Sequence, residues 1–262
     1  MAKGNDGNYL QHSVEVAVAG HLAAKHPGGR LHVALAHGMA PFEPCGEIPN
    51  GQQHALMDGA FCGTAPESSI VKAYRETKAS RKNYPNTGEL LRQVIGQEKL
   101  SGGITEIDPL KHAQLKDAWS GSCVRPINSS WRNQVRPGGV LMAPVRLSAP
   151  WLFTMDPMTY CESGDRNDDK LYRADFSRVS AAVSSFVESG QPGVAALFVY
   201  AVKPEVRPQF WAFVDDLAKE TKTTPVSCWL LHQGGNRNLA ALLCSSFVLP
   251  PDWLPHGLKV GR

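Results

Sequence analysis

The stretch Trp151-Leu152-Phe153-Thr154-Met155-Asp156-Pro157-Met158-Thr159-Tyr160 decides the fold. Its first five residues are apolar or small, a pattern typical of a short strand that helices bury on both faces. Asp156-Pro157 ends this strand, because proline has no N–H to give a central strand. An acid and an aromatic ring therefore stand at the carboxyl edge of a buried strand, where open α/β sheets bind ligands. A plain Asp-Pro turn is the alternative interpretation.

Strand and helix patterns alternate on both sides of this stretch. Further strands are predicted at residues 30–36, 103–107, 123–127, 194–202, 226–232 and 239–249, and helices at 10–24, 68–80, 87–95, 108–119, 172–189 and 208–221. We expect an α/β fold of about seven strands, a mostly parallel sheet whose closing hairpin makes an antiparallel edge. Residues 1–262 form a single domain in this prediction. A helical insertion follows the first strand at residues 45–95, and residues 41–66 are expected to be irregular because their prolines and glycines show no periodicity.

Composition limits the class of protein without naming a function. A hydrophobic fraction of 42% and a charged fraction of 19% are ordinary for a globular domain. The amino terminus does not resemble a signal peptide, and the longest apolar run is about half of what spans a bilayer. The 6 cysteines are scattered, which favours reduced thiols in a cytoplasmic protein. The histidines have no metal-ligand spacing, so we expect no metal. The short apolar runs predict no membrane association.

Two positions at predicted strand ends are candidates for binding. The turn His37-Gly38-Met39-Ala40-Pro41 follows the first strand, where a doubly wound fold binds a nucleotide-like ligand, although it lacks the G-x-G-x-x-G pattern. Glu106 ends the next strand, where a carboxylate can accept both hydroxyls of a ribose. The alternatives are a simple connection at the turn and a helix cap at Glu106, a role that suits Asp108 better.

A basic stripe lies on the predicted helix at residues 68–80. Lys72, Arg75, Lys78 and Arg81 recur every third residue, so they stay on one side of a helix. Such a stripe can follow a phosphate backbone. A solvated helix face is the commoner explanation, and the net charge of +3 does not by itself indicate a nucleic-acid partner.

These motifs together resemble the RlmJ-type 23S rRNA adenine-N6 methyltransferases, a class I family that depends on S-adenosylmethionine. The resemblance is scattered over most of the chain at low identity. The matching stretches are Gly4 to His12 (family pattern G-N-x-x-x-x-L-x-H), Ala36 to Pro41 (T-H-A-G-A-G), Tyr84 to Gly88 (Y-P-G-S-P), Thr105 to Pro109 (T-E-L-H-P), Asp156 to Tyr160 (D-P-P-Y-E) and Leu249 to Trp253 (N-P-P-W). In the second stretch the histidine is kept, while two glycines and a preceding acid are missing.

The resemblance implies a Rossmann-like class I methyltransferase fold and a set of site residues. Contacts to S-adenosylmethionine fall on His12, His37, Thr87, Glu106, Asn128, Ser129 and Asp156. Asp156 is also the implied catalytic acid, which accepts a hydrogen bond from the amino group of a flipped base while the carbonyl of Pro157 accepts another.

The departure from the family pattern concerns the ring that stacks on the base. The family has its tyrosine two residues after Asp-Pro, whereas this chain has Thr159 there and Tyr160 one place later. A one-residue shift in extended backbone points a side chain the other way. Either a bulge turns Tyr160 toward the base, or Met158 forms the platform, or the acceptor is not adenine.

We therefore expect an S-adenosylmethionine-dependent methyltransferase that acts on adenine N6 in RNA, or less readily DNA, with the basic stripe as its nucleic-acid contact. Two rival interpretations stay open: a non-catalytic cofactor-binding or nucleic-acid-binding protein on the same fold, and a methyltransferase of a small molecule or protein. The sequence does not indicate the oligomeric state.

Overall fold

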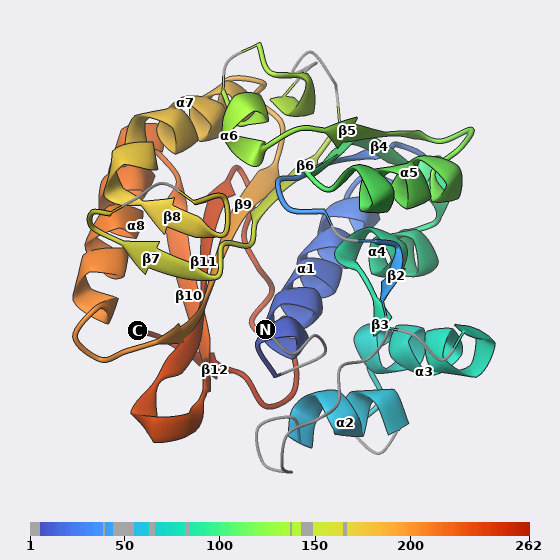
Figure 1. Ribbon diagram of the computed structural model, residues 1–262, viewed down its shortest axis with the longest axis horizontal. Coiled ribbons are helices and arrows are strands. Elements are labelled where there is room, and N and C mark those ends of the chain that lie inside the picture. Colours follow the sequence, from blue (N-terminus) through green and yellow to red (C-terminus); the bar gives the residue numbers. More distant parts are fainter. Residues whose placement is uncertain are drawn as a thin grey trace.

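An eight-stranded sheet organises the molecule (Figure 1). The structure is a computed structural model that describes residues 6–38, 40–43, 55–62, 66–81, 84–136, 138–142, 149–164 and 167–262. The strand order is β12-β10-β11-β9-β6-β1-β4-β5. The bounds are β1 Leu31–Leu35, β4 Leu100–Glu106, β5 Cys123–Asn128, β6 Trp151–Met155, β9 Gly193–Val202, β10 Thr224–Leu231, β11 Arg237–Ser245 and β12 Lys259–Val260.

The strand directions identify the fold class. β5, β4, β1, β6 and β9 pair in parallel, whereas β11 runs antiparallel between β9 and β10. Numbered along the chain, the seven long strands have the order 3-2-1-4-5-7-6, in which a Rossmann-like parallel half is followed by one inserted antiparallel strand. This is the class I methyltransferase arrangement, and it confirms the predicted fold class. The two-residue strand β12 adds an antiparallel edge beside β10.

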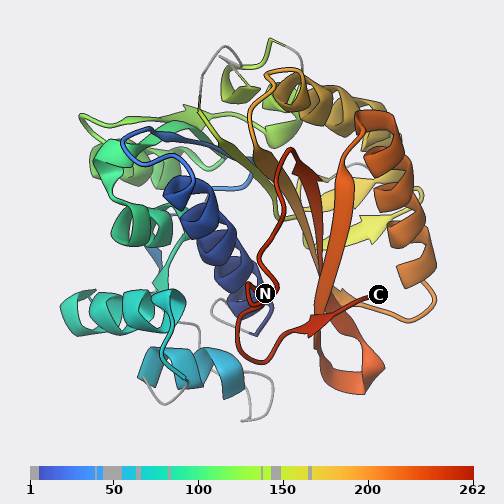
Figure 2. The same cartoon turned by 180° about the vertical axis from the view of Figure 1, so that it is seen from behind.

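Helices cover both faces of the sheet (Figures 1 and 2). One face carries α1 (Asp6–Ala24), α4 (Thr87–Ile95) and α5 (Pro109–Ala118), and the other carries α6 (Trp131–Gln134), α7 (Phe176–Val187) and α8 (Arg207–Thr221). Successive strand residues alternate between the two cores: in β6, Leu152 joins the α1 side, whereas Trp151 and Phe153 join the α7 side. Such alternation follows from the two-residue period of a strand.

The stretch that begins at Trp151 lies at the centre of the sheet, as predicted. β6 pairs with β1 on one side and with β9 on the other, and all five of its residues are buried. The ring of Trp151 packs across Gly193 at the start of β9. A Cβ atom at Gly193 would lie 2.1 Å from that ring, so only glycine fits at this position.

The insertion after β1 is helical but differs in detail from the prediction. Between β1 and β4 the described chain forms α2 (Ala55–Cys62), α3 (Ser69–Arg81), α4 and a small ladder of β2 (Phe42–Glu43) with β3 (Tyr84–Pro85). The expectation of irregular structure over residues 41–66 is therefore wrong at α2, a helix whose Met57 and Ala60 are buried. The treatment of residues 45–95 as a subdomain stays a prediction.

A second difference follows β6. A ladder of β7 (Thr159–Cys161) with β8 (Lys170–Tyr172) precedes α7, so that helix begins at Phe176 and not at Tyr172. The Tyr172 N–H donates to the Asp175 carboxylate at 3.1 Å. This bond stabilises the turn that separates β8 from the helix. Within the described residues, no helix has the length and apolar character needed to cross a bilayer.

Candidate functional site

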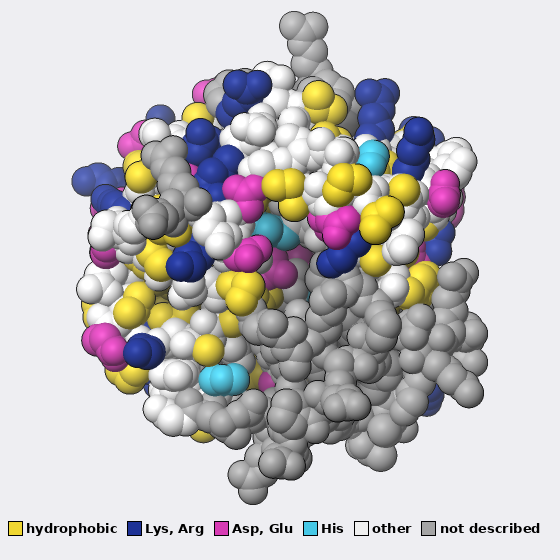
Figure 3. Space-filling model, in the orientation of Figure 1, with side chains coloured by type: hydrophobic (Ala, Val, Ile, Leu, Met, Phe, Trp, Pro, Cys, Tyr) yellow, Lys and Arg dark blue, Asp and Glu magenta, His cyan; other side chains and the backbone are white. Residues whose placement is uncertain are grey.

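A cavity of about 400 Å³ opens at the carboxyl edge of β1, β4 and β6. Acidic side chains gather around this hollow near the middle of the face in Figure 3, with a histidine inside it. The lining residues, called the carboxyl-edge cavity below, are Asn8, Ala36, His37, Gly38, Thr105, Glu106, Ile107, Asp108, Lys111, Ser129, Ser130, Trp131, Asp156, Met158, Asp168, Asp169 and Tyr200. They come from the ends of several neighbouring strands, which is where such folds bind ligands.

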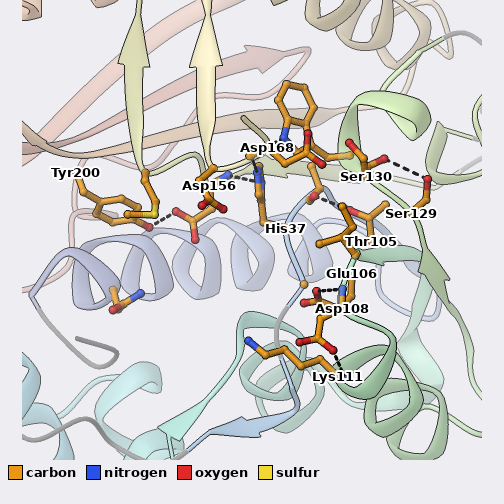
Figure 4. Close-up of a pocket in the computed structure, with 17 residues that line it drawn as sticks. His37, Thr105, Glu106, Asp108, Lys111, Ser129, Ser130, Asp156, Asp168 and Tyr200 are labelled. Atoms are coloured by element: carbon orange, nitrogen blue, oxygen red, sulfur yellow. Dashed lines mark hydrogen bonds between the residues drawn. The ribbon is translucent and has the colours of Figure 1, made fainter. Parts of the chain in front are cut away.

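His37 connects the ends of two strands. Its Nδ1 accepts a hydrogen bond from the Asp156 backbone N–H at 3.0 Å, and its Nε2 donates to the Asp168 carbonyl at 3.4 Å. Burial lowers the pKa of His37 to about 4. The ring is thus neutral near pH 7, with its proton on Nε2. Its observed role is to hold the turn after β1 against the turn after β6 (Figure 4).

Asp156 follows β6 with its side chain in the cavity, and Tyr200 of β9 points at it (Figure 4). The Asp156 Oδ1 is hydrogen bonded to the Tyr200 hydroxyl. Burial raises the pKa of Asp156 to about 7, while hydrogen bonds to Tyr200 and Gln11 act in the opposite direction. A carboxyl that titrates near neutrality can accept or release a proton under working conditions.

Glu106 lies across the cavity from Asp156 at the end of β4 (Figure 4). Its Oε1 accepts the Asp108 N–H at 2.8 Å, while the Asp108 side chain caps α5 by accepting the Leu110 N–H. Burial raises the pKa of Glu106, which the Asp108 N–H and the nearby Lys111 lower in part. A carboxylate has room for several more donors. Glu106 can therefore still accept hydroxyl groups of a ligand, and the cap role belongs to Asp108.

Arg132 on α6 holds the acidic loop at the cavity mouth. Its guanidinium donates to Asp168 Oδ1 at 2.7 Å and to both carboxylate oxygens of Asp175 at 3.0 and 3.1 Å. It also donates to the carbonyls of Asn167 and Lys170. Asp175 is fully buried. Arg132 therefore links the loop to the start of α7 and fixes the part of the loop that lines the cavity.

Some of the predicted site residues line the cavity, and others lie elsewhere. The predicted residues that line it are His37, Glu106, Ser129, Asp156 and Met158. His12 instead lies inside α1, where its Nδ1 is 2.6 Å from the Tyr74 hydroxyl, and Thr87 donates to Glu15 at 2.7 Å. The Asn128 amide donates to the carbonyls of Glu106 and Ile107 at 2.9 and 3.2 Å, so it supports the end of β4 from behind.

Of the two candidates for a stacking platform, Met158 faces the cavity and Tyr160 does not. Tyr160 is buried against Phe210 and Phe213 of α8, and its hydroxyl donates to Glu162 at 2.7 Å. Met158 is 39% exposed and lines the cavity. Pro157, which precedes both, is buried. Tyr160 sits in β7, and the pairing of β7 with β8 turns it to the α8 side of the sheet.

The helix predicted to carry the basic stripe is α3, and the two cations of the stripe whose side chains are described, Lys72 and Arg75, have acidic neighbours. Arg75 makes two bonds to the Glu67 carboxylate at 2.6 and 2.8 Å, and Lys72 lies 4.0 Å from Glu76. All four of these side chains are about half exposed or more, so the pairs contribute little to stability. The side chains of Lys78 and Arg81 lie outside what the structure describes.

Several cavity residues were not predicted from the sequence. Asp168 and Asp169 belong to a charged loop that carries no motif, and Trp131 follows Asn128-Ser129 without a pattern of its own. Tyr200 stands in an apolar strand, where its hydroxyl was the one available sign of a polar role. Glu15, which does not line the cavity, was equally hidden, because most of α1 is buried and its polar residues do not mark one exposed face.

Comparisons with known proteins show the fold alone. No protein-family model matches the chain, and no curated protein matches it. Protein LPL1258 of Legionella pneumophila, described by the family model DUF519, matches with a TM-score of 0.65 and 11% identity, over 99% of this chain and 97% of its own. The precorrin-6y C5,15-methyltransferase of Geobacter metallireducens matches with a TM-score of 0.33 and 10% identity over 87% of this chain and 88% of its own. DesVI of Streptomyces venezuelae matches with a TM-score of 0.37 and 8% identity over 90% and 93%.

Proposed function

We propose that this protein is an S-adenosylmethionine-dependent methyltransferase that modifies an exocyclic amino group, with adenine N6 in RNA, or less readily DNA, as its acceptor. One observation carries the proposal. In a sheet of order 3-2-1-4-5-7-6, Glu106 at the end of the second strand and Asp156 at the end of the fourth open into the same cavity. Methyl transfer requires the cofactor and the amino group that accepts the methyl to be held side by side. In this cavity Glu106 can bind the cofactor and Asp156 can bind the amino group.

The cavity residues fit S-adenosylmethionine. Glu106 retains acceptor capacity for the hydroxyls of a ribose, and the exposed apolar side chain of Ile107 lies beside it for an adenine ring. Gly38 lets the turn after β1 approach β4, since a Cβ there would lie 2.5 Å from the Thr105 carbonyl. The acidic lining also suits a cationic sulfonium. When bound, the cofactor supplies an activated methyl group.

The chain itself holds the acceptor and its proton. Asp156 and the carbonyl of Pro157 accept hydrogen bonds from the amino group, which orients the nitrogen lone pair and stabilises the positive charge that develops on it. Met158 provides an apolar surface for the flipped base. After transfer, the methylated nitrogen releases a proton, and the Asp156 carboxylate takes it up. The stripe on α3 is the proposed nucleic-acid contact, reached when phosphates displace Glu67 and Glu76.

The first experiment is calorimetric titration of S-adenosylmethionine into the wild type, Glu106→Ala and Glu98→Ala. Glu98 is exposed and precedes β4 at the opposite edge of the sheet, so it is the matched control. We expect Glu106→Ala to weaken binding by about 10-fold or more, the effect of lost hydrogen bonds to a charged group, and Glu98→Ala to bind like the wild type. If the wild type does not bind the cofactor, the enzyme proposal fails and a non-catalytic role on the same fold takes its place.

The second experiment identifies the acceptor. Tritium transfer from labelled cofactor is measured into RNA, DNA, protein and small-molecule fractions. Label in N6-methyladenine of RNA supports the proposal. A specific observation favours one rival: five of the titratable cavity residues, Glu106, Asp108, Asp156, Asp168 and Asp169, are acids, whereas Lys111 is the one lysine among the lining residues. This lining suits a cationic amine of a protein or small molecule better than a phosphate, and label in those fractions would replace the nucleic-acid acceptor with such an amine.

A further inference from the structure

Glu15 on α1 is a buried carboxyl near the half-buried Asp156. Its exposed fraction is 0%. The Thr87 hydroxyl donates to its Oε2 at 2.7 Å, and the Gln11 amide donates to its Oε1 at 3.4 Å. In the part of the chain that the structure describes, no lysine or arginine forms an ion pair with Glu15. A buried carboxylate without a cation is costly, so its position calls for a reason beyond packing.

A continuous set of hydrogen bonds joins Glu15 to Asp156. Gln11, one turn before Glu15, places its amide nitrogen on Glu15 and its amide oxygen 3.0 Å from the Tyr200 hydroxyl. The same hydroxyl contacts Asp156 Oδ1. Gln11 and Tyr200 are both buried, with exposed fractions of 4% and 8%. The path Glu15–Gln11–Tyr200–Asp156 thus runs from the interior of α1 to the cavity.

The direction of these bonds fixes where a proton lies. Tyr200 has one hydroxyl hydrogen but faces two oxygens, Gln11 Oε1 and Asp156 Oδ1. If the hydroxyl donates to Gln11, Asp156 Oδ1 must carry a proton and donate to Tyr200. Glu15 then accepts at both of its oxygens, as an ionised carboxylate does. This arrangement has a neutral Asp156 and a charged Glu15.

Turning the Gln11 amide produces the opposite arrangement. Its nitrogen then donates to the Tyr200 oxygen, Tyr200 donates to an ionised Asp156, and a protonated Glu15 donates to the Gln11 oxygen. The turn gives up one bond of the first arrangement, the 3.3 Å bond from the Gln11 amide nitrogen to the Thr87 hydroxyl oxygen. The net change is one proton from Asp156 to Glu15, and no covalent bond other than two O–H bonds is broken or made.

We propose that Glu15 is a positioning residue that sets the charge of Asp156, because the two carboxyls hold one proton between them and the Gln11 amide turns as that proton changes sides. The arrangement with the proton on Glu15 leaves Asp156 negative, which is the form that accepts a hydrogen bond from an amino group. Its use in methyl transfer rests on the proposed function. The shared proton itself does not.

The surroundings agree with a shared proton. Burial raises the pKa of Glu15 to about 8, and the charge of Asp156 raises it further. The other titratable group in direct contact with the Asp156 turn, His37, is neutral near pH 7 because burial lowers its pKa to about 4. The remaining charged groups that line the same cavity are Glu106, Asp108, Lys111, Asp168 and Asp169. Asp168 forms an ion pair with Arg132 at 2.7 Å. Thr154 of β6 and Thr87 of α4 face Glu15 with neutral hydroxyls.

The test is a pH titration of the carboxyl carbons of Asp156 and Glu15 by ¹³C NMR, in the full-length protein without cofactor. Two interacting groups titrate in two steps that both residues report. We expect this two-step curve in the wild type. In Glu15→Gln, Asp156 should titrate in one step at a midpoint at least one pH unit lower than the upper wild-type step. Glu89→Gln, a change at an equally buried glutamate on α4 that pairs with Arg92, should leave the Asp156 curve unchanged.

If Glu15→Gln does not fold, a second variant still tests the proposal. Gln11→Leu removes the group between the two carboxyls, and with it a hydrogen bond that lowers the pKa of Asp156, so the Asp156 midpoint should rise. A fall of the Asp156 midpoint in Glu15→Gln or a rise in Gln11→Leu supports the proposal. A single Asp156 step with the same midpoint in wild type and variants would overturn it. Because no cofactor or acceptor is present, this result is independent of whether methyl transfer is observed.

Discussion

Asp156 combines three properties on one side chain: partial burial, a hydroxyl neighbour and a place in the carboxyl-edge cavity. We expect Asp156→Ala to lower kcat by about 100-fold or more, the range for the loss of a group that accepts a proton in the reaction. Asp156→Asn keeps a hydrogen-bond acceptor and should retain more activity than Asp156→Ala. Single-turnover methyl transfer measures both, and calorimetry checks that the affinity for S-adenosylmethionine changes little. Equal loss in the two variants would contradict a hydrogen-bonding role.

At the same scale, sequence reasoning found residues whose position is set locally and missed those set by tertiary packing. Glu106 and Asp156 were predictable because a carboxylate at the end of a buried strand is recognisable from the strand pattern alone. Tyr160 was harder, since its direction depends on the pairing of β7 with β8. Tyr200 stands in a strand that is apolar on both faces, so no periodicity shows which of its residues reach the cavity.

Among the elements, α4 and α5 illustrate what a local pattern can predict. α4 runs from Thr87 to Ile95, as expected, because Asn86 caps its start and Gly96 follows its end. α5 starts after its cap at Asp108. β7 and β8 were missed because each has three residues, too few for a recognisable alternation. α2 was missed because it lies among glycines and prolines, which obscure its periodicity.

The link between α6 and the cavity loop depends on Arg132. Replacing Arg132 by alanine removes the two bonds from its guanidinium to the fully buried Asp175 carboxylate and leaves Arg178, at 3.2 Å, as the remaining cation described there. Hydrogen bonds to a charged group are typically worth about 1.5–3 kcal/mol. We expect a loss of this size in the free energy of unfolding, measured by urea denaturation. Arg173→Ala is the matched control, since Arg173 pairs with Asp216 on the surface, where the two side chains are 41% and 51% exposed. That variant should lose about 1 kcal/mol or less.

The α3 stripe makes a prediction about salt. Reversing Lys72 and Arg75 to glutamate should weaken RNA binding and lower the slope of log affinity against log salt by about 0.7 for each phosphate that the protein no longer neutralises. The matched control reverses Lys219 and Lys222 at the end of α8, the helix that covers the other face of the sheet. Both variants change the net charge equally. An equal effect of the two, or an unchanged slope in the first, would place the nucleic-acid contact somewhere other than α3.

For the whole molecule, the buried titratable groups predict how stability depends on pH. His12, His32 and His37 have pKa values lowered by burial to about 3, 4 and 4, from 6.5. The unfolded chain therefore binds more protons than the folded one between about pH 4 and 6.5, and stability rises with pH over that range. Glu15 and Asp156 have the opposite effect on how stability depends on pH. Their pKa values are raised to about 8 and 7, so the folded chain holds protons that the unfolded chain has lost, and stability falls as pH rises from about 4.5 to 8.

These opposite contributions place the stability maximum near pH 6.5, with a decline toward pH 8 that comes from the two carboxyls. Glu15→Gln removes one of them, so its alkaline decline should be shallower by up to about 1.4 kcal/mol per pH unit wherever the folded wild type alone keeps that proton. Urea denaturation at pH 5, 6.5 and 8 measures the difference. The free energy of unfolding of the variant, relative to that of the wild type, should increase as pH rises. It should be lowest at pH 5, where Glu15 of the wild type is protonated in the folded state at little cost. A difference in the free energy of unfolding between the two proteins that stays constant with pH would mean that Glu15 is ionised in the folded state throughout this range. Glu15 would then share no proton with Asp156.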